Sequence, residues 1–307
     1  MLLSYNVFKQ VTRQKDLPLH FSSLVASLRG WGSLVLLLVL VIMLVQWLLE
    51  AWKWQVMLST AHPIKLPEAF RMILSGIALS IATPNRMGEF AGRVMHLPGG
   101  QRLQGTAYTV IGNFAQLIIT CIAGSIALCM EWQDQHLYPT GAGLQAVQTI
   151  LLWATPLTII FFMLLYFKAG MVFNWILSLR MLGKFRDKLG TLTTIPNSIL
   201  LKVLLLSSLR FAFFILQYWL LFKLTNTGIG FRDTFAAISI MLLWLAIVPT
   251  FSFLELGLRW EFALLLMGSL TENALGIAVS VTAVWLINLM LPAAVGAIGL
   301  MRYRSGH

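Results

Sequence analysis

Apolar runs long enough to cross a bilayer constrain this chain more than any other feature. One of them, GSLVLLLVLVIMLVQWLLEAW, starts at Gly32 and is too long for a helix in the core of a soluble protein. It suits a membrane-spanning helix, which needs about 20 apolar residues. Only 11% of the 307 residues are charged, whereas a soluble domain carries about 25%. The sequence therefore predicts an all-α, polytopic membrane helix bundle.

The hydropathy pattern predicts about eight hydrophobic segments. They cover residues 32–52, 69–82, 104–130, 146–167, 199–222, 231–248, a shorter stretch that ends near 267, and 274–301. The segment 69–82 is short for a membrane span, and a proline follows both it and the segment 231–248. We therefore expect broken or re-entrant helices at Pro84 and Pro249.

A basic region divides the chain near its middle. Its basic residues are Lys168, Arg180, Lys184, Arg186, Lys188 and Lys202, and Asp187 is its single acidic residue. The apolar residues of this region recur near helical spacing, which is typical of an amphipathic segment on a membrane surface. We expect one domain, 1–307, with motif-bearing halves of about 1–167 and 196–307 joined by the basic region 168–195.

The distribution of Lys and Arg predicts the orientation. These residues collect in cytoplasmic loops, so the net charge of +11 does not indicate nucleic-acid binding. The basic N-terminus, the 168–202 region and the C-terminal Arg302 and Arg304 should be cytoplasmic, and the loop 131–145, which lacks Lys and Arg, should be outside. We expect an integral protein of a bacterial inner membrane with both termini in the cytoplasm. Trp52, Lys53 and Trp54 look like an interfacial anchor.

The first charged motif is TPNRMGEFAGR, residues 83–93. Glu89 and Arg93 are four residues apart and share one helix face. A charge at the bilayer centre costs about 2.5–3.5 kcal/mol, so such residues are rare unless paired, wetted or functional. A helix that starts at membrane depth exposes free N–H groups to an anion, and arginine binds phosphate bidentately. The residues that shape the motif are Thr83, Pro84, Asn85, Gly88 and Gly92. The alternative is a pair that only neutralises itself and locks a kinked helix.

The second motif, residues 249–259, repeats the pattern with Pro249, Glu255, Gly257 and Arg259. Its alternative is an interfacial ion pair whose charged ends reach water. Two copies suggest two related elements that face a common polar site. In that site Arg86, Arg93 and Arg259 would bind a lipid phosphate. Glu89 and Glu255 would orient the arginines or exchange a proton.

The motif TPNRMGEFAGR resembles the transmembrane region of lysylphosphatidylglycerol synthases, a flippase-like family. The stretches QWLLEAWKWQVML and PTFSFLELGLR support the resemblance, which covers nearly the whole chain. It implies movement of a modified lipid across the bilayer, with Pro84, Gly88, Glu89, Arg93, Pro249, Glu255 and Gly257 as motif residues. In larger members this region is joined to a cytosolic aminoacyl-lipid synthase. Because this sequence ends at His307, we expect no synthase domain, and the second motif carries the bulky Phe251, Phe253 and Leu254.

We therefore expect a protein that binds an anionic phospholipid or lipid-linked precursor and moves it between leaflets. The alternatives are a scaffold or regulator that binds lipid or partner subunits and, less favoured, a lipid head-group enzyme. The sequence has no HExxH, Walker A or G-x-S-x-G motif, so we expect no enzyme activity, no catalytic residue, no metal and no cofactor. Expected partners are membrane lipids, a second copy of the chain or a separate lipid-modifying enzyme. Asn288, a polar residue in an apolar segment, should make a hydrogen bond between helices.

Overall fold

Helices account for the regular structure in the described part of the chain. The computed structural model describes residues 30–59, 61–81, 83, 86–134, 142–178, 195–248 and 252–305, and these residues contain no strand. The predicted all-α class is confirmed.

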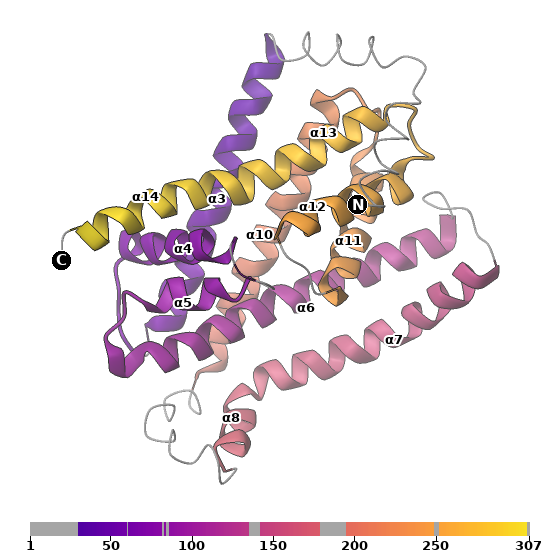
Figure 1. Ribbon diagram of the computed structural model, residues 1–307. Coiled ribbons are helices and arrows are strands. Elements are labelled where there is room, and N and C mark those ends of the chain that lie inside the picture. The colour runs from indigo at the N-terminus through magenta and orange to yellow at the C-terminus, as the bar shows by residue number, and fades with distance from the viewer. Residues whose placement is uncertain are drawn as a thin grey trace. The chain divides into compact units, whose positions relative to one another are not determined.

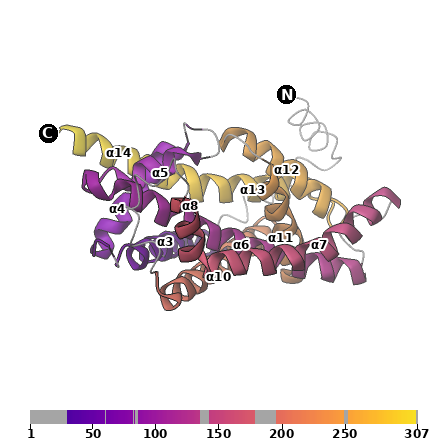
Figure 2. The ribbon, with the colours of Figure 1, turned by 90° about the horizontal axis from the view of Figure 1, so that it is seen from below.

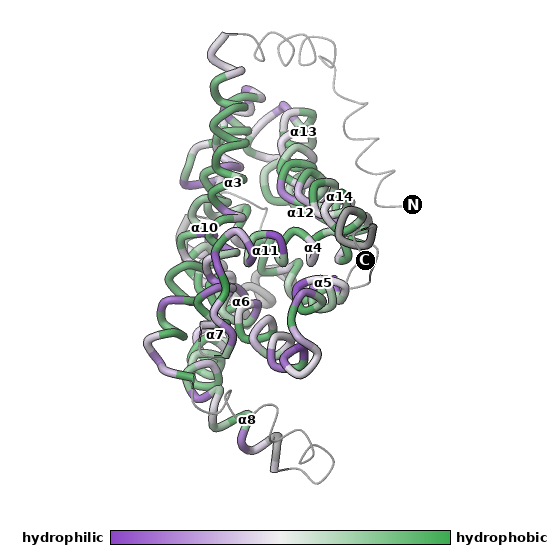
Figure 3. Tube along the Cα trace, turned by 90° about the vertical axis from the view of Figure 1, so that its left-hand side faces the viewer, coloured by the Kyte–Doolittle hydropathy of each residue, from purple (hydrophilic) through white to green (hydrophobic). Residues whose placement is uncertain are grey.

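Each predicted hydrophobic segment corresponds to a helix or to consecutive helices. These are α3 (Trp31–Leu58), α4 (Leu66–Ser80), α6 (Arg102–Asp134), α7 (Ala142–Phe167), α10 (Asn197–Leu224), α11 (Phe231–Ile247), α12 (Ser252–Met267) and α13 (Ala274–Trp285). The π-helix η5 (Leu286–Met290) continues α13 into α14 (Leu291–Ser305). The tube of α3 is mainly hydrophobic in its N-terminal part, which contains the apolar run 34–45 (Figure 3).

The predicted count of eight spans is not confirmed. In the described residues, four helical stretches are long and apolar enough to cross a membrane: Trp31–Leu58, Gly99–Trp132, Asn197–Leu224 and Ala274–Met301. A fifth results if Trp153–Phe167 and Ala169–Trp175, bent by 75°, form one span. The remaining hydrophobic helices, such as α4 with 15 residues and α12 with 16, are shorter. The long helices nonetheless make this an integral membrane protein.

Both segments that precede a proline are interrupted. Helix α4 ends at Ser80 and the short α5 (Gly88–Val94) follows, whereas α11 ends at Ile247 and α12 begins at Ser252. Pro84, Asn85 and Pro249 themselves lie outside the described residues. The re-entrant course of these segments therefore stays a prediction. Of the basic region, α8 (Ala169–Ser178) is described and residues 179–194 are not.

The chain forms two compact units built from interleaved stretches. Unit 1 contains Met1–Val45, Thr120–Pro156 and Ala212–Met290, and unit 2 contains Gln46–Ile119, Leu157–Phe211 and Leu291–His307. Helices α3, α6, α7 and α10 each contribute residues to both units. The single-domain organisation and its division into two halves stay predictions.

In unit 2, the short helix α5 packs on α4, and α14 packs on α4 as well (Figures 1 and 2). Glycines allow these close approaches. A Cβ atom at Gly92 would lie 2.4 Å from the carbonyl oxygen of Ser75, and one at Gly296 would lie 2.1 Å from that of Leu74. A Cβ at Gly88 would lie 2.1 Å from the carbonyl oxygen of Leu79. The predicted role of Gly88 and Gly92 in close helix packing therefore fits this structure.

In unit 1, polar side chains connect the apolar helices. The Asn288 amide of η5 donates to Gln217 Oε1 of α10 over 2.6 Å, and Gln217 in turn donates to the Val39 carbonyl of α3 over 3.2 Å. Thr225 and Ser280 share a buried hydrogen bond of 3.0 Å between α10 and α13. The hydrogen bond expected of Asn288 is thus present.

The two charged motifs each contain a glycine whose surroundings differ, which gives a matched test. Gly92→Ala should lower the free energy of unfolding by about 1–3 kcal/mol, because the new methyl group clashes with the α4 backbone. Gly257→Ala should be neutral or gain up to about 1 kcal/mol, because no atom lies within 4 Å of its Cβ position. Thermal unfolding of both variants in detergent measures the difference. Equal melting temperatures would contradict the close packing of α5 on α4.

Candidate functional site

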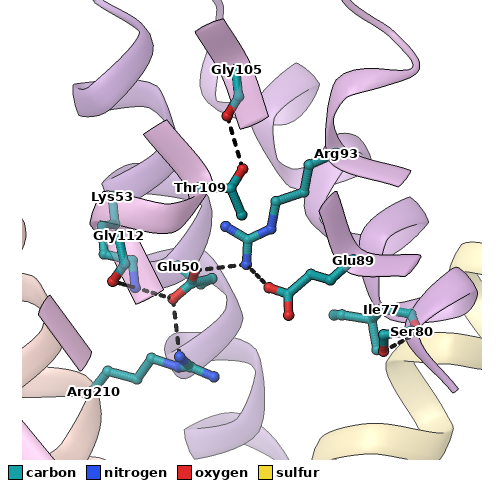
Figure 4. A network of polar contacts seen from close by, with 10 residues as sticks. All are labelled: Glu50, Lys53, Ile77, Ser80, Glu89, Arg93, Gly105, Thr109, Gly112 and Arg210. Carbon is teal, nitrogen blue, oxygen red and sulfur yellow. Dashed lines mark hydrogen bonds and ion pairs between the residues drawn. The ribbon is translucent and has the colours of Figure 1, made fainter. Parts of the chain in front are cut away.

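A buried carboxylate in α3, that of Glu50, gathers three cationic side chains within unit 2. Glu50 Oε2 lies 2.7 Å from Lys53 Nζ and 3.0 Å from an Arg210 Nη atom, and Oε1 lies 2.9 Å from an Arg93 Nη atom. The same Arg93 nitrogen also donates to Glu89 Oε1. Figure 4 shows the three cations converging on Glu50, with Glu89 on the far side of Arg93. We call Glu50, Lys53, Glu89, Arg93 and Arg210 the charged network.

Three helices position the charged network. Glu50 and Lys53 are three residues apart on α3, so they lie on one helix face. Glu89 and Arg93 are four residues apart on α5, and Arg210 comes from α10. The Lys53 ammonium also donates to the Gly112 carbonyl of α6 over 3.4 Å. The ion pairs therefore connect helices that are distant in sequence.

The charged network is largely dry and carries an excess of positive charge. The side chains of Glu50, Lys53 and Arg93 are almost fully buried, whereas that of Glu89 is 18% exposed and that of Arg210 26%. Three cations against two carboxylates leave one positive charge in excess. A buried charge is costly unless it is paired, so an anion near the network would be stabilised.

Three buried N–H donors around the charged network lack an acceptor in the described part of the chain. They are Nε of Arg93, Nε of Arg210 and Nε1 of Trp47. The guanidinium of Arg210 lies over the Trp47 ring at 5.2 Å, so two of these donors are neighbours. Buried donors are almost always hydrogen-bonded in native structures. This part of the network is therefore suited to a ligand or water that offers acceptor oxygens.

Two other residues of the first motif, Thr83 and Arg86, precede α5. Thr83 Oγ1 accepts the N–H of Gly88, the first residue of α5, over 2.7 Å and lies 3.3 Å from the carbonyl oxygens at the end of α4. Thr83 is not the N-cap of α5, which is Met87, but its hydroxyl accepts the N–H of the first residue of the helix. Arg86 precedes α5 and is half-buried. Its φ of 57° is a left-handed backbone conformation that residues other than glycine rarely adopt.

The second motif forms a smaller cluster in unit 1. Arg259 donates to Glu255 Oε1 from two nitrogens, at 3.0 and 2.6 Å, and to the Tyr218 hydroxyl at 3.2 Å. Arg259 is 8% exposed and Tyr218 is fully buried. This burial argues against the alternative of a pair that extends to water. No atom lies within 4 Å of the Cβ position of Gly257, so this glycine is not needed for a close helix contact.

Three members of the charged network were not predicted as site residues from the sequence. Glu50 and Lys53 lie in an apolar helix, and Arg210 lies in another. The interpretation of Lys53 and Trp54 as interfacial anchors is wrong, because both are at most 2% exposed; Trp52 is half exposed. The available signal was that a charged residue inside an apolar segment is rare unless it has a partner or a function.

The comparison with protein families agrees with this membrane architecture. Residues 17–301 match the lysylphosphatidylglycerol synthase TM region, where TM stands for transmembrane. The chain belongs to this family. Membership in the lysylphosphatidylglycerol synthase TM family indicates a lipid-related membrane function, and the match concerns the transmembrane region rather than a catalytic domain. No curated protein matches the sequence.

The two carboxylates of the charged network should differ in their effect on stability. Glu50→Gln should lower the free energy of unfolding by about 3–5 kcal/mol, because it leaves buried cations without their counter-charge. Glu89→Gln should cost less, because Glu89 contacts one cation of the network and is partly exposed. Unfolding in detergent, followed by tryptophan fluorescence, measures both changes.

Glu68→Gln is the matched control, because Glu68 is exposed and has no salt bridge within the described residues. It should lower the free energy of unfolding by at most about 1 kcal/mol, because Glu68 lies in the first turn of α4. If Glu89→Gln lowered the free energy of unfolding as much as Glu50→Gln, Glu50 would not be the residue that organises the charged network.

Proposed function

We propose that this protein binds an anionic phospholipid or lipid-linked precursor and moves its head group between the leaflets of a bacterial inner membrane, with both chain termini in the cytoplasm. The observation that carries the proposal is the charged network, with its excess positive charge and with nearby N–H donors that have no acceptor among the described residues. Family membership supports a lipid as the ligand.

Arg210 is the member of the charged network that best fits contact with a lipid head group. It is the most exposed of the three cations, and one face of its guanidinium lies against Trp47. Arg93 is held by two carboxylates and is nearly inaccessible. In this proposal Glu50 bridges Arg93 and Arg210, and the lipid phosphate competes with Glu50 for Arg210 during passage. Arg259, with one carboxylate and one hydroxyl, would act as the corresponding contact in unit 1.

A second candidate is a scaffold or regulator that binds lipid without moving it. The observation in its favour is that the charges of Glu50, Lys53 and Arg93 already pair with one another in a buried environment. A purely structural network would need no lipid. The two candidates differ in one measurable property, the movement of labelled lipid between leaflets.

Reconstitution into vesicles with fluorescent phosphatidylglycerol separates the two candidates. Wild-type protein should move the labelled lipid, so that a membrane-impermeant reductant quenches more than the outer-leaflet half. Arg210→Gln should slow this movement by roughly 10- to 100-fold, because a hydrogen bond to a charged group contributes about 1.5–3 kcal/mol. Thermal unfolding should change less than in Glu50→Gln, because Arg210 is partly exposed and Glu50 keeps Lys53 and Arg93 as partners.

Lys202→Gln is the matched control, because Lys202 is an exposed cation on the same helix α10 and lies eight residues before Arg210. It removes the same charge and should leave lipid movement unchanged. A wild-type protein that binds phosphatidylglycerol but does not move it would overturn the transport proposal in favour of the scaffold.

A further inference from the structure

A second polar site lies beside the charged network, in a cavity of about 650 Å³ within unit 2. Its walls come from α4, from α14 and from His96, two residues after the end of α5. Binding sites for small molecules have volumes of about 300–1,000 Å³, so the cavity has room for a lipid head group. The sequence pattern did not single out any of its polar residues as site residues.

The polar residues of the cavity follow one face of α4. Glu68, Arg71 and Ser75 are spaced by three and four residues, and all three line the cavity together with His96. The Ser75 hydroxyl and His96 Nε2 share a hydrogen bond of 2.9 Å. The Glu68 and Arg71 side chains are exposed, and neither has a salt bridge in the described part of the chain. Arg71 therefore presents a guanidinium that is not paired with a carboxylate of the described residues.

The positive charge of the cavity comes from Arg71 at neutral pH. Burial lowers the pKa of His96, although the nearby carboxylate of Glu68 acts in the opposite direction. The imidazole is therefore uncharged and contributes a hydrogen-bonding nitrogen. With Glu68 ionised, the cavity offers a single cation, a hydroxyl and an imidazole, together with one carboxylate that repels surplus negative charge.

Two consecutive residues of α4, Ser75 and Gly76, lie between the cavity and the charged network. Ser75 lines the cavity, whereas a Cβ atom at the next residue, Gly76, would lie 3.0 Å from the Arg93 Cγ atom. The two sites differ in accessibility: the arginine of the cavity is exposed, whereas Arg93 is buried between carboxylates. An incoming phosphate would reach Arg71 without displacing a carboxylate.

We infer that this cavity binds the phosphodiester group of a phospholipid, with Arg71 as the cation and Ser75 and His96 as hydrogen-bonding partners. The inference rests on the proposed function in that it names where the lipid phosphate first binds. A guanidinium binds phosphate oxygens in a planar fork, and the hydroxyl can donate a further hydrogen bond. The Glu68 carboxylate selects ligands of low charge. It repels a phosphate monoester, which can carry two negative charges, more strongly than a phosphodiester, which carries one.

Short-chain lipids test this assignment in detergent solution. The probes are dihexanoyl phosphatidylglycerol, a phosphodiester, and dihexanoyl phosphatidic acid, a phosphomonoester, with dissociation constants measured by calorimetry at pH 8. Wild-type protein should prefer the diester. Arg71→Gln should weaken diester binding at least tenfold, and Glu68→Gln should reduce the preference by improving binding of the monoester.

Lys65→Gln is the matched control, because Lys65 is an exposed cation at the start of α4 and does not line the cavity. It should bind both lipids as the wild type does. Unchanged diester binding by Arg71→Gln would overturn the inference. Equal affinity for soluble glycerophosphoglycerol, which lacks acyl chains, would overturn the lipid assignment and indicate a site for a free phosphodiester.

The failure of this inference and that of the proposed function give different results. If Arg71→Gln abolishes diester binding but wild-type protein moves no lipid in vesicles, the cavity assignment stands and transport fails. If wild-type protein moves lipid and Arg71→Gln binds and moves it equally well, transport stands and the cavity assignment fails.

Discussion

The arrangement of unit 2 depends on the ion pairs of the Glu50 carboxylate. This carboxylate is almost fully buried and contacts three cations, which come from α3, α5 and α10. In a low-dielectric interior, a cation without a counter-charge is strongly disfavoured. Any movement of α5 or α10 away from Glu50 would leave Arg93 or Arg210 with fewer partners. The carboxylate therefore holds these helices together and keeps an excess of positive charge inside apolar surroundings.

The short helix α5 depends on its neighbours more than on its own sequence. It has seven residues, and isolated helices shorter than about 12 residues are marginal in water. Thr83 binds its first N–H group, Gly92 lets its backbone approach α4, and Arg93 connects it to Glu50. The residues that identify the first motif in the sequence are thus the ones that hold α5 in place. One of them, Arg93, also belongs to the charged network.

Local patterns in the sequence predicted the helices, the interruptions before the prolines and the Glu89–Arg93 pair, because each depends on neighbours within a few residues. The centre of the charged network depends on pairing between distant residues: Glu50 and Arg210 are 160 positions apart. Spacing carries no information about such a partner. Lys53, flanked by tryptophans, looks like a membrane-interface residue, and only the tertiary structure shows that it is buried beside Glu50.

The two charged motifs share their spacing but differ in what surrounds the arginine. Arg93 lies between two carboxylates in a network with one positive charge in excess. Arg259 instead pairs with the single carboxylate of Glu255 and donates to the neutral hydroxyl of Tyr218. A neutral cluster attracts an anion less strongly than a cluster with excess charge. The two motifs look alike in sequence, yet the first would attract an anion more strongly than the second because their electrostatic surroundings differ.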